Sequence, residues 1–263
     1  MSSFIIAFAM YSKIPMPKVM WNEKNMKYAI CYFPLIGVVI AGVELICYRC
    51  CELLQMGSLL RGVLLSIIPL ILTGGIHMDG YLDTVDARNS YGEKEKKLDI
   101  LKDPHTGAFA IIKGMLYLAV QIGFFSEVSW YGLQVFCIAF VVSRAMSGFA
   151  LAQFKGAREN GLLASFAKGA DTKVVKKVMT AYYLLAFAVM TGMIAGMNRN
   201  ESYLIALTGM LFCSIVVFAY YRYFSYREFG GITGDLAGYF LQIVELLLLI
   251  TVVIVEKVCL WFS

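Results

Sequence analysis

The most chemically suggestive feature of this sequence is a group of three aspartates at helical spacing. Asp79, Asp83 and Asp86 follow directly after a long apolar run. In a helix, Asp79 and Asp83 are one turn apart and Asp86 comes within about 20° of two full turns from Asp79, so the carboxylates share one face. Like charges at this spacing repel unless a cation lies among them. Because Mg²⁺ commonly binds one or two carboxylates together with substrate phosphates, the pattern predicts a magnesium site and a phosphate-bearing substrate.

A solvated acidic loop without a ligand is the alternative interpretation. It fits less well, because Ile76, Leu82 and Val85 give the same helix apolar surface for burial directly beside a membrane-type segment. We therefore expect the acidic face to look into a polar cavity of a helix bundle.

A second acidic turn lies farther along the chain. Asp99 and Asp103 are again four residues apart. Pro104 should end this helix and leave His105 and Thr106 at its mouth, before the next apolar run begins. The stretch 91–97 between the two acidic turns alternates in charge, and we expect it to be an exposed connector.

The composition places these acids in a membrane protein. The chain has 263 residues, 60% of them hydrophobic and only 16% charged, with a mean hydropathy of +0.72, whereas a soluble domain has about a quarter charged residues. We expect an all-α, polytopic helix bundle that forms one integral membrane domain over residues 1–263. Long uncharged runs predict seven transmembrane helices, near 29–48, 62–76, 108–125, 130–151, 178–197, 203–221 and 238–255.

The distribution of basic residues predicts the orientation. Of the 23 Lys and Arg residues, 17 lie in the N-terminal segment and in the long connections on the same side, and four lie on the other side. Basic loops stay in the cytoplasm, so the N-terminus and the acidic turns should face it. Seven spans would put the C-terminus outside, and a missed or re-entrant segment would reverse that end. Because the basic residues lie between apolar runs, the net charge of +5 does not indicate nucleic-acid binding.

Several motifs are spread along the chain: KIPMP at 13–17, FPLIG at 33–37, GGIHMDGYLDTVD at 74–86, LDILKDPHTG at 98–107, SR at 143–144, ARENG at 157–161, and GGITGD at 230–235 with Gly238 and Glu245. Together they resemble a known family of membrane enzymes, the cobalamin synthase (adenosylcobinamide-GDP ribazoletransferase) family. They occur in family order over almost the whole chain. The chain departs from the family pattern at a few positions. Ala87 stands where the family usually has Gly, and Asp99 where it usually has Glu. Ala108 and Ala110 also depart from the pattern, in the turn after Gly107.

The resemblance implies a reaction in which adenosylcobinamide-GDP is joined to α-ribazole or its 5′-phosphate with release of GMP, a late step of cobalamin assembly. It also implies the bacterial or archaeal inner membrane as location, and the reaction fits the Mg²⁺ cofactor and the cytoplasmic active site predicted above from the acids and the basic loops. The expected partners are these substrates and membrane lipid, without nucleic acid. Self-association or association with other cobalamin-assembly enzymes is left open.

Roles within this reaction can be assigned to the acids and histidines. We assign Asp79, Asp83 and Asp86 to the metal, and Asp99 as a further ligand that is one methylene shorter than the usual Glu. Asp103 is either another ligand or the base that accepts the hydroxyl proton, and the sequence does not separate the two. The chain has two histidines. His105 is a candidate for a phosphate or base contact, and His77 for a substrate contact or a structural hydrogen bond.

The candidate diphosphate contacts are basic. They are Arg88, Lys102, Arg144 and Arg158, since guanidinium groups suit bidentate phosphate binding. Arg144 lies within an apolar run, where a charge costs about 2.5 kcal/mol or more, so it should face the acidic cavity or a substrate anion, or else snorkel to the basic side. Glu44 and Glu245 also lie in apolar runs and are either buried partners of Arg144 or interfacial.

A glycine-rich segment before the last apolar run supplies two further candidates. Thr233 and Asp235 offer a hydroxyl and a carboxylate, and the neighbouring glycines allow close backbone approach to a phosphate or a base. A simple turn is the alternative interpretation of this segment.

Two other functions remain as alternatives. A CDP-alcohol phosphotransferase-like lipid head-group synthase also uses clustered aspartates, but only the opening of its pattern matches, at Asp83, Asp86, Ala87 and Arg88. A transporter would place its charges near the membrane midplane, and here the acids cluster toward one side.

Overall fold

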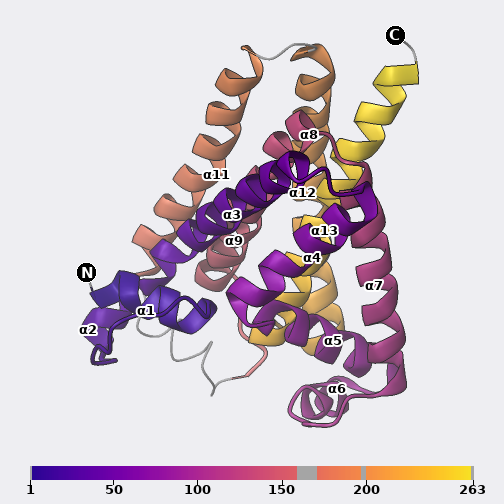
Figure 1. The fold of residues 1–263 in the computed structure, drawn as a ribbon. Helices are drawn as coiled ribbons and strands as arrows, with labels where there is room; N and C mark the ends of the chain where they lie inside the picture. The colour runs from indigo at the N-terminus through magenta and orange to yellow at the C-terminus, as the bar shows by residue number, and fades with distance from the viewer. Residues whose placement is uncertain (1, 159–170, 197–199, 262–263) are drawn as a thin grey trace.

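The computed structural model describes residues 2–158, 171–196 and 200–261, and this part of the chain forms a bundle of helices (Figure 1). Within these residues no strand forms, and the paired extended backbone is limited to an isolated parallel bridge between Gly156 and Ile232. The predicted all-α fold class is confirmed. The helices are α1 (Ser2–Tyr11), α2 (Glu23–Met26), the 3₁₀ helix η1 (Ala29–Tyr32), α3 (Phe33–Leu53), α4 (Ser58–Thr73), α5 (Ile76–Asn89), α6 (Lys94–Ile100), α7 (Ala108–Glu127), α8 (Trp130–Phe136), α9 (Ile138–Gln153), α11 (Thr172–Ile194), α12 (Asn200–Phe229) and α13 (Gly234–Trp261).

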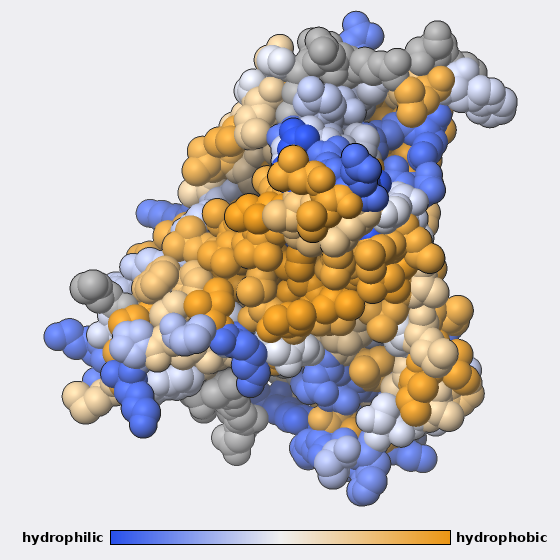
Figure 2. All heavy atoms as spheres, in the orientation of Figure 1, coloured by the Kyte–Doolittle hydropathy of each residue, from blue (hydrophilic) through white to orange (hydrophobic). Residues whose placement is uncertain are grey.

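Five helical segments in the described chain are long and apolar enough to cross a membrane. The count rises to six if α4 and α5 are taken as one bent span, so the predicted number of seven is not confirmed. Apolar side chains gather across the middle of the face shown in Figure 2, and hydrophilic ones lie toward both ends. The protein is therefore a polytopic membrane helix bundle. The five segments are Glu23–Leu53, Ala108–Glu127, Trp130–Gln153, Thr172–Ile194 and Glu201–Phe229.

A sharp bend separates the apolar helix α4 from the acidic helix α5. Gly74 and Gly75 have φ values of +65° and +77°, a left-handed conformation that glycine adopts without steric cost. Gly74 ends α4, and the chain leaves the pair of glycines at 95° to its former direction. The acidic residues are thereby turned across one end of the bundle instead of continuing along the axis of α4.

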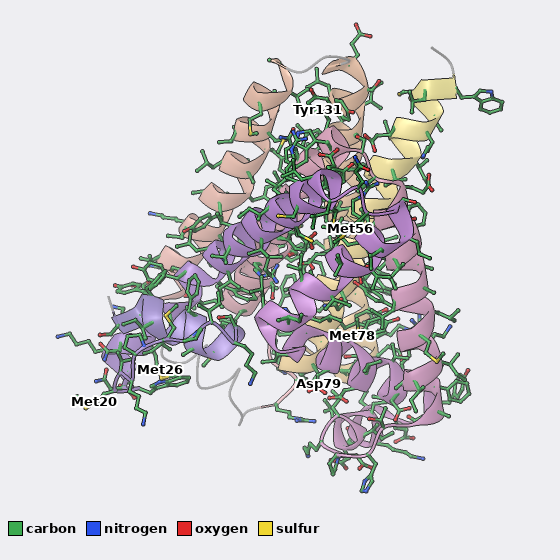
Figure 3. The ribbon with its side chains drawn as sticks, viewed as in Figure 1. Met20, Met26, Met56, Met78, Asp79 and Tyr131 are labelled. Atoms are coloured by element: carbon green, nitrogen blue, oxygen red, sulfur yellow. The ribbon has the colours of Figure 1, made fainter. Side chains whose placement is uncertain are left out.

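The two ends of the bundle carry different elements. Met78 and Asp79 of α5 lie near one end, and Tyr131 of α8 lies near the other (Figure 3). Figure 1 places α1, α2 and α6 toward the end of α5, and the last turn of α13 at the opposite end.

Two glycines allow α5 to lie directly on the start of α13. A Cβ atom added at Gly80 would lie 2.7 Å from the backbone oxygen of Asp235, and one at Gly238 would lie 2.8 Å from the backbone oxygen of His77. Beside this contact the rings of Tyr81 and Tyr239 stack, with centroids 5.6 Å apart and planes within 6° of parallel. The packing fixes the first turn of α13 against the acidic helix.

Candidate active site

The acidic face of α5 forms in the structure as the helical spacing predicts. Asp79 is exposed, Asp83 and Asp86 are half-buried, and the opposite side of the helix is buried in the bundle. A fourth carboxylate, that of Asp235, joins them through the close contact between Gly80 and the start of α13. The negative charges of Asp79, Asp235 and Asp86 all act on Asp83. The site therefore combines acids from two segments about 150 residues apart in the sequence.

Crowding of these acids changes the chemistry of Asp83. α5 runs across the end of the bundle and is not one of the five spanning segments. Burial, followed by the charges of Asp79, Asp235 and Asp86, raises the pKa of Asp83 to about 6. Burial also raises the pKa of Asp235. Both shifts mean that the local environment disfavours further negative charge, and a cation would relieve that penalty.

The metal site itself stays a prediction. Among the described residues, no three His, Cys, Asp or Glu side chains are grouped so that they could already hold one metal ion. The available donors are hard carboxylate oxygens, which match the preference of Mg²⁺ for oxygen ligands.

Asp86 also has a structural role. Its Oδ2 atom accepts a hydrogen bond of 3.0 Å from the backbone N–H of Gly107. A Cβ atom at Gly107 would lie 2.2 Å from Asp86 Oδ1, so a larger residue there would displace the carboxylate from this hydrogen bond. Asp86 therefore ties the connection between α6 and α7 to the acidic helix.

The second acidic turn forms its own local pairs. Lys102 Nζ lies 2.9 Å from Asp99 Oδ1. Asp103 Oδ1 accepts the backbone N–H of His105 at 2.9 Å and lies 2.7 Å from its Nδ1 atom. Hydrogen bonds from Lys102 and from His105 lower the pKa values of Asp99 and Asp103, respectively. All four side chains are exposed or largely exposed, and in this structure their partners come from the turn itself.

The glycine-rich segment before α13 is partly a structural turn. Gly230 has a φ of +78°. Ile232 pairs with the strand-like segment after α9 through backbone hydrogen bonds of 2.9 Å with Lys155 and Ala157. Thr233 is buried and its Oγ1 atom accepts the backbone N–H of Leu236 at 3.2 Å, which caps the start of α13. The turn interpretation thus holds for Thr233, and the proposed ligand contact remains a prediction.

Arg158 lies between the two acidic groups. Its guanidinium donates to the backbone oxygen of Leu98, and its charge acts on both Asp235 and Asp99. Arg158 is therefore placed where an anion near the α5 acids could reach it. The rest of its motif, residues 159–161, lies outside the described residues.

Arg88 and Lys102 point to other partners in the structure. The Arg88 guanidinium lies 5.4 Å from the centre of the Phe224 ring, and its charge acts on Tyr239. Lys102 pairs with Asp99 as described above. Arg88 therefore extends toward α12 and α13, and a role in binding substrate remains a prediction for both residues.

The structure corrects the expectation that residues 91–97 form only an exposed connector. Lys97 is buried, with 9% of its surface exposed, and its Nζ atom lies 2.5 Å from Glu228 Oε2 at the end of α12. Lys94 Nζ also donates to the backbone oxygen of Tyr226. No local pattern could reveal these contacts, because the partners are more than 130 residues apart.

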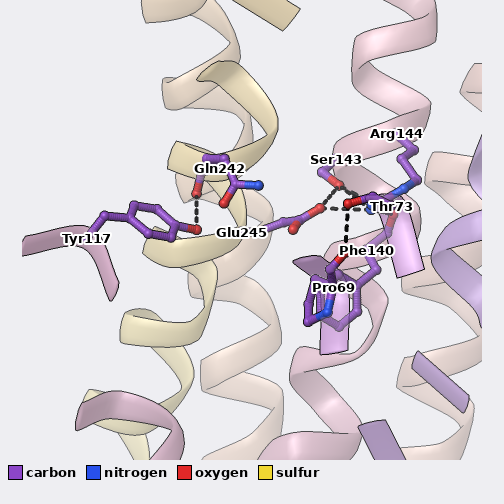
Figure 4. A network of polar contacts seen from close by, with 8 residues as sticks. All are labelled: Pro69, Thr73, Tyr117, Phe140, Ser143, Arg144, Gln242 and Glu245. Carbon is purple, nitrogen blue, oxygen red and sulfur yellow. Dashed lines mark hydrogen bonds and ion pairs between the residues drawn. The ribbon is translucent and has the colours of Figure 1, made fainter. Parts of the chain in front are cut away.

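Arg144 lies in the core of the bundle, with 1% of its surface exposed. Its Nη1 atom donates to Glu245 Oε1 at 2.8 Å and to the backbone oxygen of Phe140 at 2.9 Å (Figure 4). Ser143 donates to the same carboxylate oxygen at 2.6 Å. Of the two possibilities for Glu245, the buried partner of Arg144 is confirmed. A direct contact between Arg144 and the diphosphate has no support in this geometry.

His77 is buried beneath the acidic face. Its ring meets the edge of Phe33 at 5.8 Å between centroids, and the Arg144 charge acts on it. Its Nε2 atom has no hydrogen-bond partner among the described residues. His77 therefore packs between α5 and the helices that hold Arg144 and Phe33, and its predicted substrate contact remains untested.

Comparisons with known proteins identify the family of this chain. Residues 3–253 match the family described as cobalamin-5-phosphate synthase. A protein of Lachnoclostridium phytofermentans, named adenosylcobinamide-GDP ribazoletransferase, is 45% identical over 99% of this chain and 97% of its own length. A protein of the same name from Treponema denticola is 33% identical over 95% of this chain and 97% of its own length. Another from Clostridium botulinum (strain Alaska E43 / Type E3) is 31% identical over 92% of this chain and 93% of its own length. No solved structure matches. The chain therefore belongs to the cobalamin-5-phosphate synthase family.

Proposed function

We propose that this protein transfers the adenosylcobinamide phosphate group of adenosylcobinamide-GDP to α-ribazole or its 5′-phosphate, releases GMP, and depends on Mg²⁺. Family membership and the names of the full-length relatives support the reaction. The observation that carries the site assignment is the gathering of Asp79, Asp83, Asp86 and Asp235 at one end of a membrane bundle. The CDP-alcohol alternative is not favoured by these comparisons.

The proposed reaction is a displacement at phosphorus. A hydroxyl oxygen of the ribazole forms a bond to the phosphorus that carries cobinamide, the bond from that phosphorus to the bridging oxygen breaks, and GMP leaves with this oxygen. A bound Mg²⁺ would neutralise charge on the diphosphate and favour ionisation of the attacking hydroxyl. Asp83 and the neighbouring acids of α5 would hold the cation, and Arg158 would contact the diphosphate.

Asp103 is a poor proton acceptor in this arrangement. Hydrogen bonds from His105 lower the pKa of its carboxyl, and a stronger acid is a weaker base. We propose that Asp103 and His105 orient the entering substrate at the mouth of the site, and that ionisation of the hydroxyl depends mainly on the cation. Asp99 would serve as an additional outer ligand.

The test is GMP release by the purified, detergent-solubilised protein given adenosylcobinamide-GDP and α-ribazole, with Mg²⁺ or with a chelator. The wild type should release GMP only with the metal, and Asp83→Asn should lose at least about 100-fold in rate, since it removes the charge and keeps the volume. Asp171→Asn is the matched control, because Asn caps the start of α11 as well as Asp does. Metal-independent release, or near wild-type activity of Asp83→Asn at saturating Mg²⁺, would contradict the metal assignment.

A further inference from the structure

A long groove between α9, α11 and α12 lies outside the site described above. One hollow of about 190 Å³ has an almost wholly apolar lining, and a second of about 980 Å³ adjoins it. Phe149, Ile215 and Phe218 line both hollows, so the two form one continuous groove. α11 packs against α9, but only 17% of its apolar window is buried in the protein (Figure 1). Both hollows open onto the outer surface of the bundle.

The polar end of this groove is basic. Arg222 and Arg227 line the larger hollow, and both are exposed. On the opposite wall, Lys176 Nζ donates at 2.9 Å to Gln153, another lining residue. Lys94 and Lys97 contact the same end of α12, which places this end on the side of the bundle that carries α5 and α6.

These cations are incompletely neutralised. Arg222 lies 5.6 Å from the centre of the Phe154 ring and 5.9 Å from that of Tyr226, and it has no carboxylate partner among the described residues. Arg227 bonds the hydroxyl of Tyr223 and lies 3.8 Å from Glu228. Glu228, however, is held at 2.5 Å by Lys97. The polar end of the groove thus has an excess of positive charge.

We propose that this groove binds one anionic phospholipid, with its phosphate between Arg222 and Arg227 and an acyl chain along Phe149, Ile215 and Phe218. An apolar channel open to the membrane suits an acyl chain, and basic pockets between helices on the cytoplasmic side of a membrane suit anionic head groups. A helix of a second copy fits less well, because it would have to bring its own acid to Arg222. The site is independent of the transfer reaction.

Native mass spectrometry of the full-length protein tests the proposal. The protein is exchanged into an equimolar mixture of dioleoyl phosphatidylglycerol and dioleoyl phosphatidylethanolamine in detergent, and the lipid retained is measured. The wild type should retain one phosphatidylglycerol in preference to phosphatidylethanolamine. Each basic residue near an anionic surface contributes about a factor of five, so the double variant Arg222→Gln, Arg227→Gln should bind phosphatidylglycerol about 25-fold more weakly.

Two further variants keep the outcome decisive. Arg222→Lys with Arg227→Lys retains the charge and should retain the lipid, and Lys18→Gln with Lys24→Gln removes two exposed charges elsewhere and should have no effect. Equal retention of both lipids by the wild type, unchanged retention by the Gln variant, or a dimer that excludes lipid from the groove would overturn the proposal. The readout is binding alone, so it does not depend on the proposed activity.

Discussion

Replacing Gly80 with alanine should damage the acidic site more than the fold. The added Cβ would lie 2.7 Å from the backbone oxygen of Asp235 and 2.9 Å from its Cα atom. An ordinary van der Waals contact begins at 3.4 Å, so the two backbones would have to separate by about 0.7 Å, the difference between these distances. Neither atom can move away by a simple side-chain rotation, because both belong to the backbone at the start of α13.

The cost in stability is moderate. Overpacking of a well-packed contact costs about 1–3 kcal/mol, and the higher helix propensity of alanine offsets about 0.5–1 kcal/mol of that. We therefore expect a net loss of about 1–2 kcal/mol. The effect on catalysis should be larger, since displacing a catalytic group by about 1 Å can cost about 100-fold in rate. Because Asp235 would be displaced by about 0.7 Å, somewhat less than 1 Å, kcat should fall about 10–100-fold.

The assay combines GMP release with thermal denaturation in the same detergent. Gly42→Ala in α3 is the matched control, because a Cβ there would have no atom within 4 Å. It should leave kcat unchanged and slightly raise the apparent Tm. If Gly80→Ala behaves like Gly42→Ala in both measurements, then the close contact between α5 and α13 does not position the acids, and the reasoning is refuted.

Two further predictions concern charge. The pKa of Asp83, raised from 3.8 to about 6, means that the folded, metal-free protein holds this proton more tightly than the unfolded chain. Protonated Asp83 therefore stabilises the folded state. This contribution is fully present below about pH 4 and is lost as the pH rises through 6. In the presence of a chelator, Asp83→Asn should therefore raise the apparent Tm at pH 7.5 but not at pH 4. Below pH 6, the Mg²⁺ concentration needed to activate the wild type should rise about tenfold per pH unit. A Mg²⁺ requirement that does not change with pH would refute the assignment of Asp83 to the metal. Arg144→Met should lower the free energy of unfolding by about 3–5 kcal/mol, because it leaves Glu245 buried without its partner. The double variant Arg144→Met, Glu245→Met should regain most of this loss. An equal loss in apparent Tm for both variants would show that packing, and not charge, dominates at this pair.

Local spacing and composition were sufficient for the membrane class and for the acidic face of α5. Four-residue spacing of Asp79 and Asp83 depends only on helix geometry, so the shared face could be read without any tertiary contact. Apolar runs likewise identify most of the spanning helices, because a bilayer demands about 20 apolar residues whatever their neighbours are.

What could not be predicted depends on contacts between distant segments. Gly74 and Gly75 lie at the end of an apolar run, and only their left-handed φ values show that the chain turns by 95° there. The ion pair of Lys97 with Glu228 and that of Arg144 with Glu245 join residues more than 100 positions apart. Spacing indicates which face of a helix a charge occupies, but not which helix meets that face.

The bend between α4 and α5 explains how an acidic site and an apolar bundle coexist in one chain. If α5 continued the axis of α4, three aspartates would enter the hydrocarbon region at about 2.5–3.5 kcal/mol each, or roughly 8–10 kcal/mol in all. Two left-handed glycines avoid this cost, since glycine adopts positive φ freely. The turned helix still buries His77, Tyr81 and other residues against the bundle, so the acids rest on a rigid support at one end of the bundle. Under the proposed function, a water-soluble nucleotide-linked substrate can thus reach the acids without crossing the membrane.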